Sequence, residues 1–270
     1  MVSPSFSFSF YQRISSQLAY FFLQSGSTTD YTIIDYFFVF LGPATVLFFT
    51  FYLWWSGKRK NHKIMRITQE SLLQVFSKEF EDLVMEQMSS NGGLLFPKYK
   101  KSALIPFKDF RIVFALEERH LMLSVIISWF SGAKDYVALE ANPKRGKIPT
   151  KIQIIPKKEE GQIKKHQDLL FTLDEIELGV RQLDETYIWK ASSNRSGLYF
   201  LSEKALLKNI HKMRDFLVRI SIDSSDDPSI RIYVKINKDL DLEQLYITFM
   251  ALCERVDQVV DKTIMKKTRN

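Results

Sequence analysis

Cysteine is almost absent from this chain of 270 residues, which contains only Cys253. A single cysteine excludes a disulfide bond within the chain and a metal site built from several thiolates. This usage is typical of a reducing compartment. Because Leu252 and Val256 flank Cys253 at helical spacing, we expect a packed thiol and not a nucleophile.

Catalytic and metal-binding motifs are also missing. No two of the four histidines stand at the spacing of metal ligands, and there is no glycine-rich phosphate loop, G-x-S-x-G elbow or H-E-x-x-H pair. Acidic pairs such as Asp226-Asp227 and Glu159-Glu160 fall in expected turns or helix starts, where solvation or capping explains them. We therefore expect a protein that is not an enzyme and has no cofactor or metal.

Charge is absent from one long stretch, Tyr36 to Gly57, which covers 22 residues. An α-helix of this length spans about 33 Å, close to the roughly 30 Å hydrocarbon core of a bilayer. Tyr36 stands near one end, and Trp54 and Trp55 stand near the other, which is typical of membrane interfaces. The stretch predicts a single transmembrane helix over residues 36–57.

Basic residues follow this stretch at once, whereas residues 1–35 contain only Arg13. By the positive-inside rule, residues 1–35 form a short extracytosolic or lumenal segment and the C-terminal domain faces the cytosol. The host membrane is the endoplasmic reticulum if the source is eukaryotic and the plasma membrane if it is prokaryotic. The topology determinants are Lys58, Arg59, Lys60 and Lys63.

The region after the membrane stretch has helical periodicity. Apolar residues recur at three- and four-residue steps from Ile64 to Met88 and predict a juxtamembrane amphipathic helix over residues 58–92. Asn91-Gly92-Gly93 is expected to end it, because glycine supplies the C-cap conformation. A loop from Pro97 to Pro106 then leads into the rest of the chain.

Residues 93–265 are predicted to form an α+β domain with helices packed on one face of a sheet. The alternation of Ile230, Ile232, Val234 and Ile236 with polar residues is typical of a half-buried strand. Ser202 is a candidate N-cap. Strands are expected at 110–116, 135–141, 151–155, 186–191, 216–222 and 229–236, and helices at 159–171, 202–213 and 242–264. Residues 120–130 fit a helix, although their alternation also fits a strand.

Two stretches share the element order β-α-β-β-α. Their corresponding starts lie roughly 75 to 85 residues apart, and this spacing allows an internal structural duplication. No similarity at the level of single residues accompanies the shared order.

Basic residues gather in the expected loops and at the C-terminus. Such clusters can contact phosphate, either on anionic lipid headgroups or on ribosomal RNA, and the alternative is that they only keep the domain soluble. The last five residues, 266–270, form a basic tail. The candidate contact residues are Lys144, Arg145, Lys147, Lys157, Lys158, Lys164, Lys165, Lys266, Lys267 and Arg269.

The run Gly57-Lys58-Arg59-Lys60-Asn61-His62-Lys63-Ile64 after an apolar span resembles the juxtamembrane signature of the calumin-like family. That family comprises the larger subunit of the PAT complex, an intramembrane chaperone at the Sec translocon. The resemblance covers most of residues 36–265 in outline. The chain departs from the family because it lacks the long acidic segment ahead of the span and the long lysine-rich coiled coil at the end, so it resembles a truncated member.

The resemblance implies a non-enzymatic factor that docks at the Sec translocon and ribosome and assists insertion or folding of multi-spanning membrane proteins. Its expected partners are a small membrane-protein subunit, client transmembrane helices and membrane lipid. Gly42 and Pro43 are the expected packing positions within the span, because small residues permit close approach and proline permits a kink. The alternative is a membrane-tethered scaffold or sensor that binds anionic lipid or a protein partner.

Overall fold

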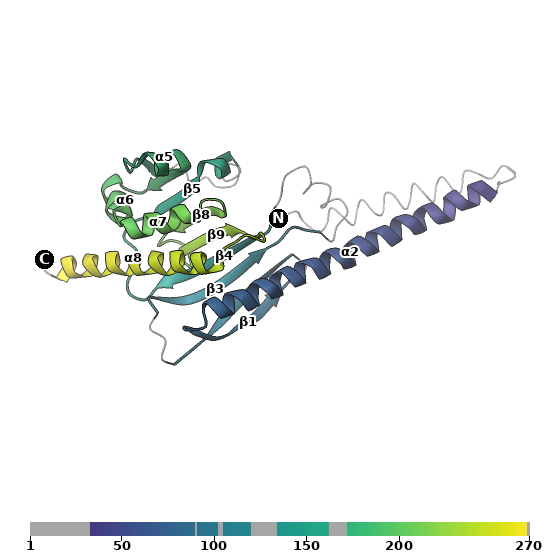
Figure 1. The fold of residues 1–270 in the computed structure, drawn as a ribbon, viewed down its shortest axis with the longest axis horizontal. Coiled ribbons are helices and arrows are strands. Elements are labelled where there is room, and N and C mark those ends of the chain that lie inside the picture. The colour runs from purple at the N-terminus through teal and green to yellow at the C-terminus, as the bar shows by residue number, and fades with distance from the viewer. Residues whose placement is uncertain (1–32, 90, 102–104, 120–133, 162–171, 269–270) are drawn as a thin grey trace. The chain divides into compact units, whose positions relative to one another are not determined.

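The computed structural model describes residues 33–89, 91–101, 105–119, 134–161 and 172–268 (Figure 1). The chain divides into two units, residues 1–51 and 52–270, and each is described by itself. Helix α2 (Ile33–Val75) begins in the first unit and ends in the second.

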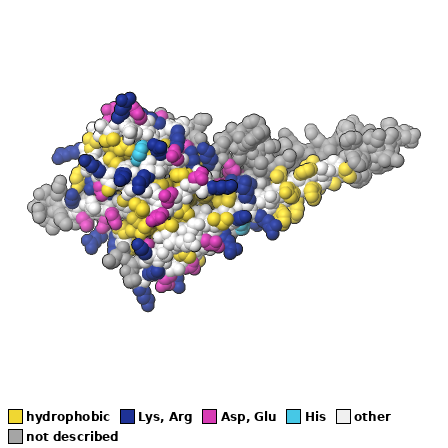
Figure 2. Space-filling model, viewed as in Figure 1, with side chains coloured by type: hydrophobic (Ala, Val, Ile, Leu, Met, Phe, Trp, Pro, Cys, Tyr) yellow, Lys and Arg dark blue, Asp and Glu magenta, His cyan; other side chains and the backbone are white. Residues whose placement is uncertain are grey.

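The described part of the first unit is the start of α2, with Pro43 inside the helix. From Leu41 to Phe51 its large apolar side chains are exposed, with Leu47 at 70% and Phe48 at 66%, and Figure 2 shows apolar surface along this part of the molecule. Thr45 donates its hydroxyl hydrogen bond to the carbonyl of Leu41 at 2.7 Å, which satisfies this polar group within the helix. Among the residues described, no helix combines the length and the apolarity needed to cross a membrane.

The second unit is an α+β domain built on an antiparallel sheet of nine strands in the order β1-β2-β3-β4-β9-β8-β5-β7-β6. Strands that are distant in sequence, such as β4 and β9, are neighbours in the sheet. The strands are β1 (Phe80–Met88), β2 (Gly92–Tyr99), β3 (Phe107–Ala115), β4 (Tyr136–Pro143), β5 (Ile152–Pro156), β6 (Asp174–Ile176), β7 (Tyr187–Ala191), β8 (Leu217–Ile222) and β9 (Ile230–Lys235).

The strand register places a row of apolar residues on one face of the sheet and a row of polar residues on the opposite face. Because side chains alternate along a strand, aligned neighbours place residues of one kind on one face. One row of cross-strand partners is apolar and runs through Leu95, Ile112, Leu139, Ile232, Ile220, Ile154 and Trp189. A neighbouring row on the opposite face is polar and runs through Arg111, Glu140, Arg231, Ser221, Gln153 and Lys190.

Helices cover the apolar face. From Asn61 to Leu72, α2 buries a row of side chains at three- and four-residue steps, and Phe76, just after the end of the helix, continues this row. The Phe76 ring lies 4.9 Å from that of Tyr246 in α8 and 5.4 Å from that of Phe110 in β3, so the residue that follows α2 packs against both α8 and the sheet. The described helices beside α2 are α5 (Arg181–Thr186), α6 (Asn194–Leu201), α7 (Lys204–Lys212) and α8 (Leu242–Thr268), with a 3-10 turn η1 (Lys157–Glu159).

The predicted helix over residues 58–92 is wrong beyond Val75, where α2 ends. The chain turns after Phe76, and Phe80 and Leu83 bury their side chains from strand β1. Asn91-Gly92-Gly93 therefore belongs to a β-hairpin and not to a helix C-cap. A Cβ on Gly92 would lie 2.8 Å from the carbonyl oxygen of Phe114, so glycine permits the close approach of β2 to β3.

The α+β prediction is confirmed, as are the strands that correspond to β3, β4, β5, β7, β8 and β9 and the helices that correspond to α7 and α8, whereas β6, α5 and α6 were not predicted. The prediction that Ser202 is a helix N-cap is wrong, because Glu203 is the N-cap of α7 and Ser202 follows the end of α6. Cys253 is fully buried in α8, and burial raises the pKa of its thiol, as expected of a packed side chain. The segment 120–130, and residues 162–171 of the other expected helix, lie outside the described residues.

The two stretches with a shared element order differ in strand pairing. β8 and β9 are paired neighbours, whereas their counterparts β4 and β5 are separated by β9 and β8. The strands of the two stretches therefore do not repeat one sheet arrangement.

Candidate functional site

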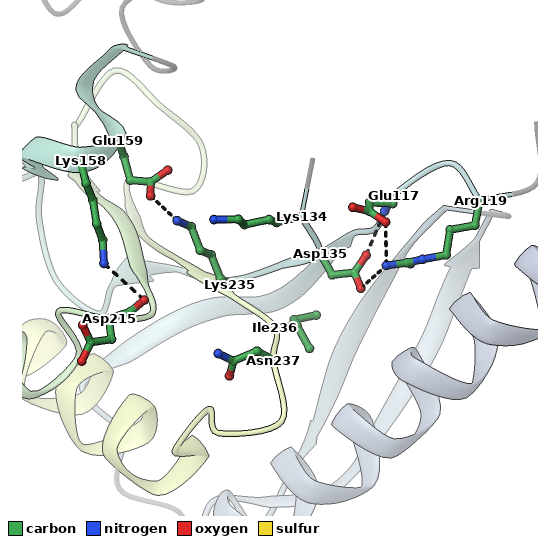
Figure 3. A pocket seen from close by; sticks show the side chains of 10 residues that line it. All are labelled: Glu117, Arg119, Lys134, Asp135, Lys158, Glu159, Asp215, Lys235, Ile236 and Asn237. Atoms are coloured by element: carbon green, nitrogen blue, oxygen red, sulfur yellow. Dashed lines mark hydrogen bonds and ion pairs between the residues drawn. The ribbon is translucent and has the colours of Figure 1, made fainter. Parts of the chain in front are cut away.

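Five adjacent strands bring charged residues to one edge of the sheet. Because neighbouring strands are antiparallel, the C-terminal ends of β3, β9 and β5 meet the N-terminal ends of β4 and β8 there. A pocket of about 620 Å³ opens at this edge (Figure 3). It is lined by four acidic residues, Glu117, Asp135, Glu159 and Asp215, by four basic residues, Arg119, Lys134, Lys158 and Lys235, and by Ile236 and Asn237.

Arg119 organises one side of this charged pocket. Its Nη2 lies 2.7 Å from Asp135 Oδ2 and 3.0 Å from Glu117 Oε2, and its Nη1 donates to Asn61 Oδ1 at 2.6 Å. Asp135 also accepts a hydrogen bond from the backbone N–H of Glu117 at 3.0 Å. Because these groups satisfy one another, this side of the pocket is a structural cluster that joins β3, β4 and α2.

Three lysines occupy the other side. Lys235 forms an ion pair with Glu159, and the two side chains are 11% and 6% exposed. Lys134 is exposed and lies beside Lys235 (Figure 3), whose positive charge is the largest cause of the lowered pKa of Lys134. Lys158 donates to the backbone carbonyl of Arg214 at 2.9 Å. In the part of the chain that is described, no ion pair joins Lys134 or Lys158 to an acid.

An apolar groove of about 420 Å³ adjoins the charged pocket. It lies between α2 and the connection from β9 to α8, with Ile64 and Ile67 on one wall and Leu240 and Leu242 on the other. Lys60, Thr68, Ser71 and Lys238 add polar groups to its lining. The groove and the charged pocket share the lining residues Asp135, Ile236 and Asn237, so an apolar space continues into a charged one.

The loop 144–147 was predicted to contact phosphate, and its three basic side chains are exposed. Gly146 supplies a φ of 64° in this loop. Arg145 lies 4.0 Å from Asp261 of α8. Burial and the neighbouring Asp261 raise the pKa of Asp257, and Arg145 and Lys144 oppose this shift, so acids of α8 offset part of the loop's positive charge.

The predicted basic clusters do not share one edge of the sheet. The loop 144–147 follows the end of β4, whereas Lys157 and Lys158 follow the end of the oppositely directed β5. Lys157 is exposed and Lys158 lines the charged pocket. Lys164, Lys165 and Arg269 lie outside the described residues, as do the side chains of Lys266 and Lys267 in α8.

The predicted topology determinants are grouped around the end of the uncharged stretch. Lys58 Nζ lies 5.4 Å from the ring centre of Trp54, and Arg59 Cζ lies 4.1 Å from that of Trp55. Lys60 lines the apolar groove and Lys63 is exposed.

The predicted packing positions Gly42 and Pro43 lie within α2, and among the described residues no atom outside the neighbouring helix backbone lies within 4 Å of a Cβ built on Gly42.

Sequence reasoning missed Lys134 and Lys235 as site residues. Their common signal is a basic residue at the end of a strand, but only the register of β4, β9 and β5 shows that these ends meet. Comparison of the chain with protein-family models and with curated proteins found no match. The similarity to the calumin-like family therefore stays a prediction.

Proposed function

We propose that residues 36–57 anchor this protein in a membrane. The observation that supports this proposal is the combination of 22 uncharged residues with exposed apolar side chains on α2, among them Val46, Leu47 and Phe51 at 60%, 70% and 63%. An apolar helical surface of this kind is costly in water and favourable in lipid. The stacked pairs Lys58–Trp54 and Arg59–Trp55 suit the headgroup level, where amphipathic rings and cations are enriched.

In this proposal the N-terminus is extracytosolic and the α+β domain is cytosolic, because the basic cluster after Gly57 favours the cytosolic side. The sequence Asn194-Arg195-Ser196 offers a direct test, since its asparagine is exposed and would be a glycosylation acceptor only in the lumen. We expect no glycan on Asn194 and a glycan on a sequon inserted within residues 1–35 in microsomes. The opposite pattern would contradict the orientation.

The domain is proposed to act as a non-enzymatic biogenesis factor that docks at the Sec translocon and ribosome and assists insertion or folding of multi-spanning membrane proteins. The exposed basic loop 144–147 supports docking on ribosomal RNA, because ammonium and guanidinium groups bind phosphate without base recognition. Gly42 within the span supports packing against a small membrane subunit or a client helix, because small residues permit close approach of helices.

The second candidate function is a membrane-tethered scaffold or sensor that binds anionic lipid or a protein partner. It is favoured by Lys134 and Lys158, which lie in a concave site and form no ion pair with a described acid. A lipid phosphate near the anchor would supply the missing negative charge.

A cross-linking pulldown of the tagged full-length protein from native membranes tests the first function. Ribosomal and Sec subunits are quantified for the wild type and for the Lys144→Glu, Arg145→Glu, Lys147→Glu variant. A matched control replaces the exposed Lys204, Lys208 and Lys212 of α7 with glutamate.

We expect enrichment that falls in the loop variant and persists in the control. Enrichment that persists in both the loop variant and the control would mean that the contact lies outside the loop 144–147. If neither the ribosome nor the translocon is enriched in the wild type, the biogenesis function is wrong.

A further inference from the structure

We propose that the charged pocket and the apolar groove together bind one anionic phospholipid. Its phosphate lies among Lys134, Lys158 and Lys235, and an acyl chain lies along Ile64, Ile67 and Leu240. This inference rests on the membrane attachment proposed above, and it goes further because it names a ligand class and a site.

The charge distribution supports a phosphate on the lysine side of the charged pocket. Glu117 and Asp135 are paired with Arg119, Glu159 is paired with Lys235, and Asp215 lies 3.6 Å from Arg214. Two ammonium groups, those of Lys134 and Lys158, therefore stand beside the Lys235–Glu159 pair without a described acid of their own, and Lys158 also donates to the backbone carbonyl of Arg214 at 2.9 Å. A phosphate accepts several charge-assisted hydrogen bonds at once and fits such a group of donors.

The neighbouring positive charges also favour an anion. The pKa of Lys134 is lowered chiefly by Lys235, so the two side chains repel each other when both are protonated. A bound phosphate would offset this repulsion and favour the protonated form of Lys134.

The apolar groove makes a lipid a better ligand than a soluble phosphate compound. It has about 420 Å³ of space, within the roughly 300 to 1,000 Å³ of ligand pockets, and its lining includes five aliphatic residues. Because it shares Asp135, Ile236 and Asn237 with the charged pocket, one molecule with a charged head and an apolar tail can occupy both spaces.

The place of the site along α2 favours a ligand from the headgroup level. Asn61 accepts a hydrogen bond from Arg119, which lines the charged pocket, and Lys60 lines the groove. Asn61 follows Trp54 by seven residues, or about 10 Å along a helix axis. If the tryptophans mark the headgroup level, a lipid reaches the site without crossing far into the cytosol.

The test measures binding to the purified full-length protein in a neutral detergent by isothermal titration calorimetry. The probes are dioctanoyl phosphatidic acid, dioctanoyl phosphatidylcholine and inorganic phosphate. The head-group variant is Lys134→Ala with Lys158→Ala, and its control is Lys204→Ala with Lys208→Ala, because all four side chains are exposed. The tail variant is Ile67→Ser, and its control is Ile247→Ser, since these side chains are 52% and 40% exposed.

We expect phosphatidic acid to bind the wild type at least about tenfold more tightly than phosphatidylcholine or phosphate. The head-group variant is expected to bind phosphatidic acid about tenfold more weakly, or weaker still. The Ile67→Ser variant is expected to bind the lipid more weakly and to bind phosphate as the wild type does. Both controls should bind as the wild type does.

Three results would overturn the proposal. The first is no phosphatidic acid binding by the wild type. The second is equal binding of lipid and phosphate with no effect of Ile67→Ser, which indicates a site for free phosphate. The third is unchanged lipid binding in the head-group variant.

Because this measurement is made in detergent, it does not require membrane insertion or a ribosome. If the protein binds lipid in detergent but is released from membranes by alkaline carbonate, the lipid site is supported and the membrane anchor is contradicted. If the protein stays in membranes but binds no lipid in detergent, the membrane anchor is supported and the lipid site is contradicted.

Discussion

Arg119 and Asn61 form a 2.6 Å hydrogen bond that joins the turn after β3 to helix α2. Asn61 also donates from Nδ2 to the backbone carbonyl of Glu117 at 2.9 Å, and its side chain is fully buried. The side-chain amide of Asn61 therefore holds the part of α2 after Trp55 against the edge of the sheet where the charged pocket opens.

Replacing Asn61 with alanine is expected to destabilise the domain by about 1 to 3 kcal/mol, because it leaves a partly buried guanidinium donor and a partly buried carbonyl without this partner. Urea unfolding of the full-length protein in detergent measures the change. Arg66→Ala is the matched control on the same helix, since its ion pair with Glu70 is exposed and should contribute less than about 1 kcal/mol. Equal effects of the two substitutions would contradict the role given to Asn61.

The buried pair of Lys235 and Glu159 is expected to be sensitive to loss of one partner. Glu159→Gln should destabilise the domain by about 3 to 5 kcal/mol, because it leaves a buried ammonium group without its counter-charge. The double variant Lys235→Met, Glu159→Gln should recover much of this loss, since no unpaired charge then remains. Thermal unfolding of the single and double variants measures both effects. A double variant that is less stable than the single one would contradict this account.

The strands with a clear alternation could be predicted from the sequence. The apolar residues of β9 face the helices, and their register with β4 and β8 completes the apolar row through Leu139 and Ile220. The long α8 was likewise predictable, because its apolar residues recur with helical period.

The first hairpin was not predictable in the same way. Phe76, Phe80 and Leu83 keep a helical spacing although the helix has ended, and their burial is set by contacts with distant residues such as Phe110. Hydrophobic period alone cannot separate these cases, since tertiary packing decides between them.

The charged pocket was not predictable from local pattern either. Lys134, Lys158 and Lys235 come from three separate parts of the chain, and the strand order β4-β9-β8-β5 brings them to one edge. A sequence shows which residues end each strand, but it does not show which strands are neighbours. Only Lys158 of this group was a predicted contact residue.

The aromatic core under α2 and α8 is expected to depend on Phe110. Its ring lies 5.2 to 5.4 Å from those of Phe76, Phe80 and Phe107 and from that of Phe249 in α8. Phe110→Ala should lower the free energy of unfolding by about 3 to 5 kcal/mol, because it leaves a cavity among these rings.

Chemical denaturation of the full-length protein measures the loss at Phe110. Ile247→Ala is the control, because this side chain of α8 is 40% exposed and should change stability by less than about 0.5 kcal/mol. A loss below about 1 kcal/mol for Phe110→Ala would mean that the site collapses around the missing ring.

Asp223 gives the domain a defined sensitivity to acid. Burial alone would raise the pKa of its carboxyl group, but hydrogen bonds from the hydroxyl and backbone N–H of Ser225, at 2.7 and 2.8 Å, and the ammonium group of Lys151 at 2.9 Å together lower it. A carboxylate with a lowered pKa stabilises the fold above its unfolded pKa of about 3.9, and this contribution is lost as pH falls through the folded value.

The variant Asp223→Asn should therefore be less stable than the wild type at pH 7, by about 1 to 3 kcal/mol, and the difference should shrink as pH falls below about 4. Urea unfolding at pH 7, 5, 4 and 3 measures the difference. Asp239→Asn is the control, because its side chain is exposed and its substitution should change stability by less than about 0.5 kcal/mol at each pH. If the difference between wild type and Asp223→Asn stays constant down to pH 3, then the hydrogen bonds of Asp223 do not depend on its negative charge.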